Sequence, residues 1–366
     1  MSKYPRAWIE LHAGALLNNL EQVRRSSDAA IIAVVKANAY GHGMKFVSRL
    51  LEPGVKAFAV AALNEALSLR ALFAEKPVIL LSGFYQPEQL AVLQSQRITP
   101  VIFNAAQIAW MEAANVYGMP VGLKIDTGMG RLGINPDFLL EAITRLQALG
   151  CEITLMSHFA SADDPAAAQN EVQHQVFKTA TRPYSYSRSF ANSAAIVSRP
   201  QDHYDMVRPG IMLYGASPLQ GVSAAGLELQ PVMHLYARLL DIKHLQRGDS
   251  VGYGATWVAD EACMLGIVSI GYGDGYPRVV RRGAQVAIAG RRYEIVGRVS
   301  MDTLAVKLDS VHRVHIGDRV ELWGEIIAAD EVADWAGTIA YELFCKIMPR
   351  VERKKRKSGS GKHEQV

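Results

Sequence analysis

The sequence predicts an α/β protein in which a (β/α)8 barrel precedes a mostly antiparallel β domain. Between about residues 31 and 215, short apolar runs alternate with helical patterns, as expected of a parallel barrel rather than an open sheet. Beyond about residue 230 the helical periodicity largely stops, and short strands follow one another between turn signals. A chain of 366 residues is long enough for both domains.

Eight short runs supply the expected barrel strands. They are residues 31–36, 57–62, 78–82, 99–103, 121–126, 152–158, 189–193 and 206–214. Helical patterns lie between most of them, including those at 65–73, 87–94 and 137–149. Asn64 is placed to cap the first of these three helices, and Asn135 followed by Pro136 is placed to cap the last.

The second half of the chain carries the strands of the predicted β domain. They are residues 232–242, 250–257, 264–270, 285–288, 293–296, 304–308 and 319–322, with one helix near 328–335. We therefore expect a barrel domain over residues 1–228, with a strand near 6–11 that packs on the β domain of residues 229–352. Residues 353–366 are predicted to form a basic, disordered tail.

Composition narrows the function classes. Apolar residues make up 49% of the chain and charged residues 20%, as in a globular protein with a large core. Much of the net charge of +4 comes from residues 353–357, where no aromatic residues interleave, so we expect no nucleic-acid partner. The 3 cysteines lack metal-ligand spacing, and no apolar run suits a signal peptide or a membrane span. We expect no metal, no membrane association and a cytoplasmic location.

Polar and charged residues follow the predicted barrel strands, whose carboxyl ends line one mouth in this fold. The residues at these ends are Lys36, Lys124 with Asp126, His158, Asn192 with Ser193, and Arg208. Such groups are costly beside buried strands unless they pair with one another or with a ligand. Fixed cations at one mouth indicate an anionic ligand such as a phosphate.

Lys36 stands out among them because it directly follows a run of apolar, mostly β-branched residues. Desolvation lowers the pKa of an ammonium group and leaves a fraction of nucleophilic amine, which suits Schiff-base chemistry with a carbonyl cofactor. Gly41 and Gly43 nearby allow the backbone to approach a ligand closely, and Tyr40 adds a phenol. A lysine that merely extends into solvent is the alternative that this local pattern leaves open.

Two glycine-rich segments resemble phosphate-binding motifs but lack their structural context. Residues 128–133 match G-x-G-x-x-G, but the helix signal begins only after Pro136, so these glycines are predicted to lie in a loop. Residues 271–275 follow a strand of the β domain with no helix behind it. We therefore expect a tight functional loop there instead of a nucleotide site.

Eight motifs in order resemble those of the alanine racemases, fold-type III pyridoxal-phosphate enzymes that interconvert L- and D-alanine. They are VVKANAYGHG (34–43), KIDTGMGRLG (124–133), SHFASAD (157–163), ANSAA (191–195), VRPGIMLYG (207–215), GYGAT (252–256), GYGDGYPR (271–278) and GRVSMD (297–302). The resemblance extends over residues 6–351 and omits the basic tail.

The resemblance implies roles for residues of the barrel. Lys36 resembles the lysine that holds pyridoxal phosphate covalently and acts as a base on one face of the substrate. Arg208 resembles the arginine facing the pyridine nitrogen, Arg131 the arginine near the substrate carboxylate, and Lys124 a lysine that is often carbamylated. Further cofactor-binding positions are matched by Tyr40, His158, Asn192, Ser193, Gly210, Ile211 and, in the β domain, Tyr341.

The resemblance also implies that the β domain completes the site. Tyr253 resembles the base on the opposite face of the substrate. A phenol ordinarily titrates at about 10, and the resemblance implies that His158 and Arg208 belong to the network that lowers this value. Met301 and Asp302 match a loop contributed by a partner subunit, and Tyr272 matches a residue at the entrance. A homodimer with composite active sites is therefore expected.

Three alternatives stay open at this point: a racemase acting on serine, lysine or many amino acids, a non-catalytic cofactor carrier, and a decarboxylase. Tyr272, Met301 and Tyr341 would crowd the substrate side chain to about a methyl group, which favours alanine. Tyr253 argues against a carrier, because a carrier needs no second base. Arg208 in place of an acid argues against a decarboxylase. A role in peptidoglycan synthesis and a role in alanine breakdown both remain open.

Overall fold

The computed structural model describes residues 5–309 and 313–356, and the chain divides into two compact units. The barrel unit consists of Asn19–Leu213 and Ser217–Val222. The β unit consists of Met1–Asn18, Tyr214–Ala216 and Ser223–Val366, so the N-terminal strand belongs with it. Helix α1 (Ala13–Ser26) runs from the one unit into the other.

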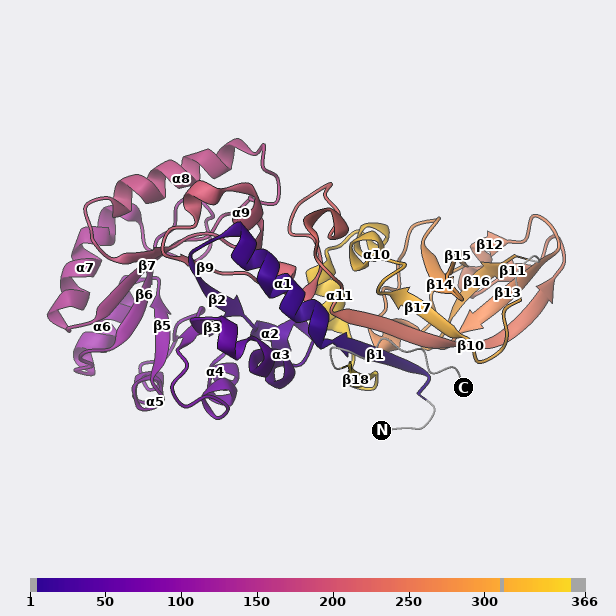
Figure 1. Cartoon of the computed structure of the whole chain (residues 1–366), viewed down its shortest axis with the longest axis horizontal. Coiled ribbons are helices and arrows are strands. Elements are labelled where there is room, and N and C mark those ends of the chain that lie inside the picture. Colours follow the sequence, from indigo (N-terminus) through magenta and orange to yellow (C-terminus); the bar gives the residue numbers. More distant parts are fainter. Residues whose placement is uncertain (1–4, 310–312, 357–366) are drawn as a thin grey trace. The chain divides into compact units, whose positions relative to one another are not determined.

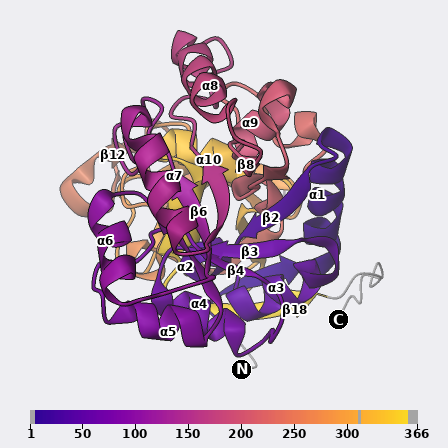
Figure 2. The same ribbon diagram turned by 90° about the vertical axis from the view of Figure 1, so that its left-hand side faces the viewer.

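The barrel unit is built on eight parallel strands (Figures 1 and 2). They are β2 (Ala30–Val34), β3 (Ala57–Val60), β4 (Val78–Leu80), β5 (Ile98–Ile102), β6 (Pro120–Lys124), β7 (Glu152–Met156), β8 (Ser187–Ser189) and β9 (Met206–Val207). From β2 to β8 each strand pairs with the next along the chain, and β9 pairs with β2. A parallel bridge between Asn192 and Arg208 connects the segments after β8 and β9, so the sheet closes into the predicted barrel.

All eight barrel strands end earlier than predicted, and two of them differ most. Strand β8 ends at Ser189, so Asn192 and Ser193 lie at the start of a helix instead of in a strand. Strand β9 ends at Val207, and Ile211–Tyr214 forms a 3-10 turn. Pro209 has no N–H with which to continue the sheet, which explains the early end of β9.

Helices surround these strands (Figure 2). They are α2 (Lys36–Tyr40), α3 (Met44–Leu51), α4 (Leu63–Arg70), α5 (Gln89–Ser95), α6 (Ala105–Ala113), α7 (Leu139–Ala148), α8 (Ala168–Thr181) and α9 (Ser193–Ser198). The Asn135 side chain accepts the N–H of Asp137, as predicted for a cap. The predicted Asn64 cap is wrong, because α4 already begins at Leu63 and the Glu65 carboxylate satisfies the backbone N–H of Ala62.

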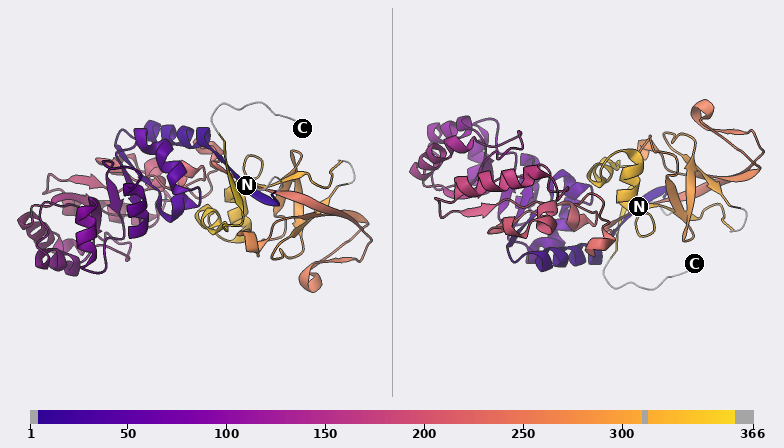
Figure 3. Two further views of the ribbon diagram at one scale, coloured as in Figure 1. Left: turned by 90° about the horizontal axis from the view of Figure 1, so that it is seen from below. Right: turned by 90° about the horizontal axis from the view of Figure 1, so that it is seen from above.

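The described residues of the β unit form two sheets, shown from two further sides in Figure 3. Its strands are β1 (Ala7–His12), β10 (Met233–Leu245), β11 (Ser250–Val251), β12 (Trp257–Val258), β13 (Cys263–Val268), β14 (Gln285–Ile288), β15 (Arg291–Val296), β16 (Leu304–Leu308), β17 (Arg319–Trp323) and β18 (Glu352–Arg356). In the larger sheet β10 pairs with both β17 and β13, so its antiparallel strands form a closed ring. The predicted strand at 250–257 is instead the β11–β12 pair with a 3-10 turn, Tyr253–Ala255, between them.

The basic segment after residue 351 corrects one prediction. Residues 353–356 do not form a disordered tail but belong to strand β18 (Glu352–Arg356), which pairs in parallel with β1. Arg356 donates from Nε and Nη2 to the buried Glu10 carboxylate, at 2.9 and 3.0 Å. The rest of the predicted tail, 357–366, lies outside the described residues.

Two helices complete the β unit, α10 (Ala329–Ala336), which was predicted, and α11 (Ala340–Lys346), which was not. The side chain of Tyr341 extends from α11. Within residues 5–309 and 313–356, no helix combines the length and the apolar composition required to cross a membrane.

Candidate active site

Lys36 is followed by four consecutive residues with left-handed backbone, Ala37, Asn38, Ala39 and Tyr40, whose φ angles are 51°, 52°, 54° and 50°. This conformation costs an L-residue roughly 1–2 kcal/mol and persists only where its surroundings enforce it. Asn38 supplies part of that enforcement, since its side chain accepts the N–H of Met44 and its carbonyl accepts the N–H of Gly43, both at 2.9 Å. The turn holds Lys36 and Tyr40 together beyond the carboxyl end of β2.

Tyr40 forms one wall of a small polar cradle. A Cβ atom on Gly210 would lie 2.7 Å from the Tyr40 hydroxyl oxygen, so only glycine allows the two segments to approach this closely. The Gly210 N–H donates to the Ser193 hydroxyl oxygen at 2.7 Å. Ser193 begins α9, and the Asn192 side chain caps this helix by accepting the N–H of Ala195 at 3.0 Å. The cradle thus unites the predicted phosphate-binding residues of the barrel unit, with Ile211 buried beside Gly210.

Arg208 is buried and makes several hydrogen bonds to neighbouring strand ends. Its Nη1 donates to the Ser189 hydroxyl at 2.7 Å, and its Nη2 donates to the carbonyl oxygens of Ser157 and Phe190 at 2.6 and 3.2 Å. Nη2 also lies 3.2 Å from Nδ1 of His158. Burial lowers the pKa of Arg208 to about 10, which still leaves the guanidinium protonated at neutral pH.

The His158 imidazole is surrounded by cations. Burial lowers its pKa well below the usual value, and the charges of Arg208, Lys124, Arg131 and Lys36 lower it further. Of these four residues, Arg208 contacts the imidazole directly, while Lys124, Arg131 and Lys36 act on it through their charges. The neutral His158 can then accept a hydrogen bond from Arg208 at Nδ1.

Lys124 lies at the end of β6, inside this group of cations. Burial, Arg208 and Arg131 lower the pKa of its amine to about 8. The following loop is organised by Asp126, whose Oδ1 accepts the N–H groups of Gly128, Met129 and Gly130 at 3.0, 2.9 and 3.2 Å. The glycines of the G-x-G-x-x-G segment all have positive φ in this loop, which confirms that they do not open a helix. The loop carries Arg131.

The β unit presents the remaining predicted residues. Tyr253 is 71% exposed in a 3-10 turn between Gly252 and Gly254, whose φ angles are 73° and 75°. Tyr272 begins a second 3-10 turn, Tyr272–Asp274, in the predicted tight loop, and its N–H donates to the Ser300 carbonyl at 3.1 Å. The side chains of Tyr253 and Tyr272 are therefore held on short, glycine-flanked turns.

Met301 and Asp302 contact the turn that carries Tyr272 through a backbone hydrogen bond and an ion-pair network, neither of which the sequence revealed. The buried Asp274 carboxylate pairs with Arg6 at 3.0 Å and with Arg350 at 2.7 Å. The same two arginines pair with Asp302, at 3.3 and 2.8 Å. The N–H of Gly273 also donates to the Met301 carbonyl. The network joins segments far apart in sequence, so no local pattern could have predicted it.

Comparison with known proteins identifies the family. Models of the alanine racemase N-terminal and C-terminal domains match residues 11–218 and 232–355. The chain belongs to the alanine racemase family. The resemblance of the eight sequence motifs is thereby confirmed.

Individual alanine racemases resemble this chain over nearly their whole length. The protein of Nitrosococcus oceani is 44% identical over 355 residues, which is 96% of this chain and 99% of that protein. The structure of the biosynthetic alanine racemase from Pseudomonas aeruginosa matches with a TM-score of 0.94 and 42% identity, and covers 96% of this chain and 99% of that one. The Bartonella henselae alanine racemase, described with covalently bound pyridoxal phosphate, matches with a TM-score of 0.88 and 29% identity over 96% of this chain and 99% of that one.

The structure also brings together polar residues near these strand ends that sequence reasoning missed. The Ser157 and Thr127 hydroxyls lie 2.9 Å apart, and the Ser157 hydroxyl donates to the Ile125 carbonyl at 2.8 Å. Ser189 supports Arg208 and donates to the Met206 carbonyl at 2.8 Å. The sequence did contain a signal for each of these residues, because small hydroxyl residues interrupt or end the apolar patterns of the strands.

Proposed function

We propose that this protein interconverts L- and D-alanine with bound pyridoxal phosphate, and that Lys36 and Tyr253 act as bases on opposite faces of the substrate. The observation that carries the proposal is the buried Arg208, which contacts His158 within the group of cations that includes Lys36. A cluster of this charge needs an anionic partner, which both the cofactor and the alanine carboxylate provide.

The cradle around Gly210 fits a cofactor phosphate. Hydroxyl groups and backbone N–H groups bind a dianion without adding a mobile charge. Tyr40, Ser193, Gly210 and Ile211 supply such groups within the barrel unit, and Tyr341 would add its phenol from the β unit. The Lys36 amine would bind the cofactor covalently. When bound, pyridoxal phosphate supplies an electron-withdrawing group that acidifies the Cα–H of an amino acid.

Arg208 would restrict the reaction to proton exchange. Its guanidinium stays charged at neutral pH and would donate a hydrogen bond to the pyridine nitrogen without protonating it. A ring nitrogen that stays unprotonated withdraws electrons less strongly, which favours rapid reprotonation of Cα over decarboxylation or transamination. This supports a racemase over the decarboxylase alternative.

Two bases are needed because one group cannot easily reach both sides of a planar carbon. The substrate amine would replace Lys36 in the covalent link to the cofactor, and the freed Lys36 amine would take the Cα proton on one face and hold it at Nζ. The Tyr253 hydroxyl would deliver a proton from Oη on the other face. Arg131 would bind the substrate carboxylate. Tyr272, Met301 and Asp302 would line the approach to the site and limit the substrate side chain to about a methyl group. Because Tyr253 lies in the β unit, we further propose a homodimer in which each barrel is completed by the partner's β unit.

We propose that Lys124 is carbamylated. The lowered pKa of about 8 leaves part of the amine neutral at physiological pH. Its nitrogen lone pair would attack the carbon of CO2, forming the N–C bond and releasing one proton, and the resulting carbamate anion would lie among the cations. The test is 13C NMR of the protein in 13C-bicarbonate. We expect a carbamate signal that Lys124→Ala removes and that Lys56→Ala, at an exposed lysine, retains.

The function is tested by incubating the purified protein with L-alanine and measuring D-alanine by chiral chromatography. We expect conversion to a racemic mixture, clearly slower conversion of L-serine, and none of L-lysine. Comparable turnover of all three would move the protein to the broad-specificity class. Conversion of the amino acid into the corresponding amine, with release of CO2, would instead indicate a decarboxylase.

A further inference from the structure

Helix α8 presents amide side chains to the loops that carry the site. Gln169 donates to the Gly128 carbonyl at 2.7 Å, and Asn170 donates to the carbonyl oxygens of Ser161 and Asp164 at 3.1 and 2.9 Å. Gln173 lies one turn further along the helix and is completely buried. These amides are neutral, so their hydrogen bonds do not depend on pH.

Gln173 makes the most central of these contacts. Its Nε2 donates to the His158 carbonyl at 3.0 Å and to the Thr127 hydroxyl at 3.1 Å. Its Oε1 accepts the N–H of Ala160 at 2.9 Å. One buried amide thereby fixes the backbone of the loop after β7 on both sides of Phe159 and connects it to the loop after β6.

The contacts continue from Gln173 to Arg208. Thr127 contacts the Ser157 hydroxyl, and the Ser157 carbonyl accepts a hydrogen bond from Arg208. Arg208 in turn contacts the His158 imidazole. Gln173 therefore holds the backbone of His158, while Arg208 holds its ring.

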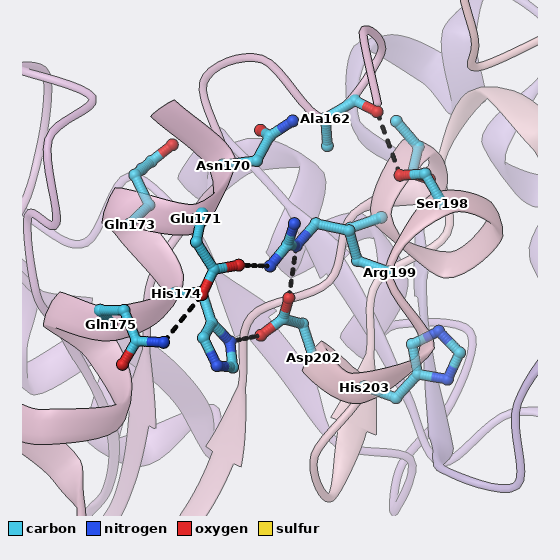
Figure 4. A network of polar contacts seen from close by, with 12 residues as sticks. Ala162, Asn170, Glu171, Gln173, His174, Gln175, Ser198, Arg199, Asp202 and His203 are labelled. Atoms are coloured by element: carbon cyan, nitrogen blue, oxygen red, sulfur yellow. Dashed lines mark hydrogen bonds and ion pairs between the residues drawn. The ribbon is translucent and has the colours of Figure 1, made fainter. Parts of the chain in front are cut away.

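The opposite side of α8 is anchored, so Gln173 has a rigid support (Figure 4). His174 pairs with the fully buried Asp202, which also accepts from Nε of Arg199 at 2.6 Å. Arg199 Nη2 donates to Glu171 at 3.0 Å. These contacts attach α8 to the segment that follows α9 and leads into β9.

We propose that Gln173 is a positioning residue for racemisation, whose amide fixes His158 against Arg208 and registers the loop after β6, which carries Arg131, with the loop after β7. This inference rests on the proposed role of His158 and Arg208 at the cofactor. If Gln173 were only structural, substituting it would change the stability of the protein alone. If it positions His158, substituting it also changes the kinetics and the cofactor affinity.

The test compares Gln173→Glu and Gln173→Met in the full-length protein reconstituted with pyridoxal phosphate. Glu has the same shape as Gln, and because position 173 is completely buried the pKa of its carboxyl should be raised. The protonated carboxyl can donate to the His158 carbonyl as the amide does, whereas the ionised carboxylate opposes that carbonyl. The charged groups around His158 are Arg208, Lys124, Arg131 and Lys36. We expect Gln173→Glu to keep kcat/KM near the wild-type value where its carboxyl is protonated and to lose it as the pH rises and the carboxylate forms, so that the pH profile differs from that of the wild type.

Gln173→Met keeps the volume but removes all three hydrogen bonds. We expect kcat to fall by about tenfold with KM changed less than twofold, a drop of about 1.4 kcal/mol in transition-state stabilisation. We also expect the apoprotein to bind pyridoxal phosphate about fivefold more weakly, which is a readout independent of turnover. If this variant fails to fold, Gln173→Glu carries the test.

The matched control is Gln107→Met. Gln107 on α6 is equally buried and ties two loops in the same way, accepting the Phe103 N–H at 2.8 Å and donating to the Phe84 carbonyl at 2.7 Å. Its loops follow β4 and β5 and carry none of the predicted site residues. We expect a lower melting temperature with an unchanged pH profile and cofactor affinity. Gln173 variants that match this control would overturn the proposal, whereas an inactive wild type would instead reject the proposed function.

Discussion

At the residue scale, Lys36 carries the sharpest prediction. Lys36→Ala removes the amine that would bind the cofactor, so racemisation and the visible absorbance of the bound cofactor should both disappear. The control is Lys45→Ala, which removes an exposed lysine of α3 and should change neither. Borohydride reduction and peptide mapping complete the test. A cofactor still attached to another lysine would contradict the assignment.

A second residue-scale prediction concerns Arg208. Lysine keeps the positive charge but cannot reproduce contacts to Ser189, Ser157 and His158 from one planar group. Arg208→Lys should lower stability by about 2–4 kcal/mol, at about 1–3 kcal/mol for each buried acceptor left unpaired. Activity should fall at least tenfold. Denaturant unfolding and steady-state kinetics measure the two effects, and wild-type values for both would refute the role of Arg208.

At the element scale, strand β18 contributes to the stability of the β unit. Ending the chain after Val351 removes Arg356 and leaves the buried Glu10 without its ion-pair partner. We expect a loss of about 2–4 kcal/mol, below the full cost of a completely buried pair because Arg356 is half exposed. Ending the chain after Arg356 keeps the pair and serves as the control. Equal unfolding midpoints for the two truncated chains would show that β18 contributes nothing.

Two histidines, one on β1 and one on β10, lead to a prediction that the stability of the protein depends on pH. The rings of His12 and His234 stack with centroids 4.1 Å apart. Burial, with the charge of His234, lowers the pKa of His12 to about 4. The folded state therefore excludes a proton that the unfolded chain binds below about 6.5, so stability falls as the pH decreases from about 6.5 to about 4.

His12→Phe removes this titration while keeping a ring in the stack. The slope of melting temperature between pH 7 and pH 5 should become flatter than in the wild type. A slope that does not change would mean that His12 is not the titrating group.

At the scale of the whole molecule, the predicted bases lie on different units, Lys36 on the barrel unit and Tyr253 on the β unit. The proposed head-to-tail dimer implies that inactive Lys36→Ala and Tyr253→Ala chains complement each other. A hybrid dimer would hold one site with both defects and one intact site. Mixing under conditions that exchange subunits should restore at most about half of the wild-type activity per hybrid dimer. No recovery, despite demonstrated exchange, would mean that both residues act within one chain.

The sequence by itself determined the two-part architecture. The spacing of apolar residues shows which short segments are buried as strands or helices, and this spacing can be seen within each segment alone. The sequence also indicated the family, and it led to the proposal of site residues at the barrel mouth, because a charged residue beside an apolar strand is costly without a partner or a ligand. Gly210 illustrates the limit. Its presence in a motif was visible, whereas its reason, the approach of the Tyr40 hydroxyl, comes from a segment far away in the sequence.

Only the tertiary structure decided where non-local partners meet. The tertiary structure places Asn192 and Ser193 at the start of α9 rather than in a strand, and it shows that the basic segment after residue 351 forms a strand. It also joined Gln173 to His158. The physical reason is the same in each case: hydrogen bonds and ion pairs between distant segments form only when the fold brings the partners together, and no local pattern encodes them.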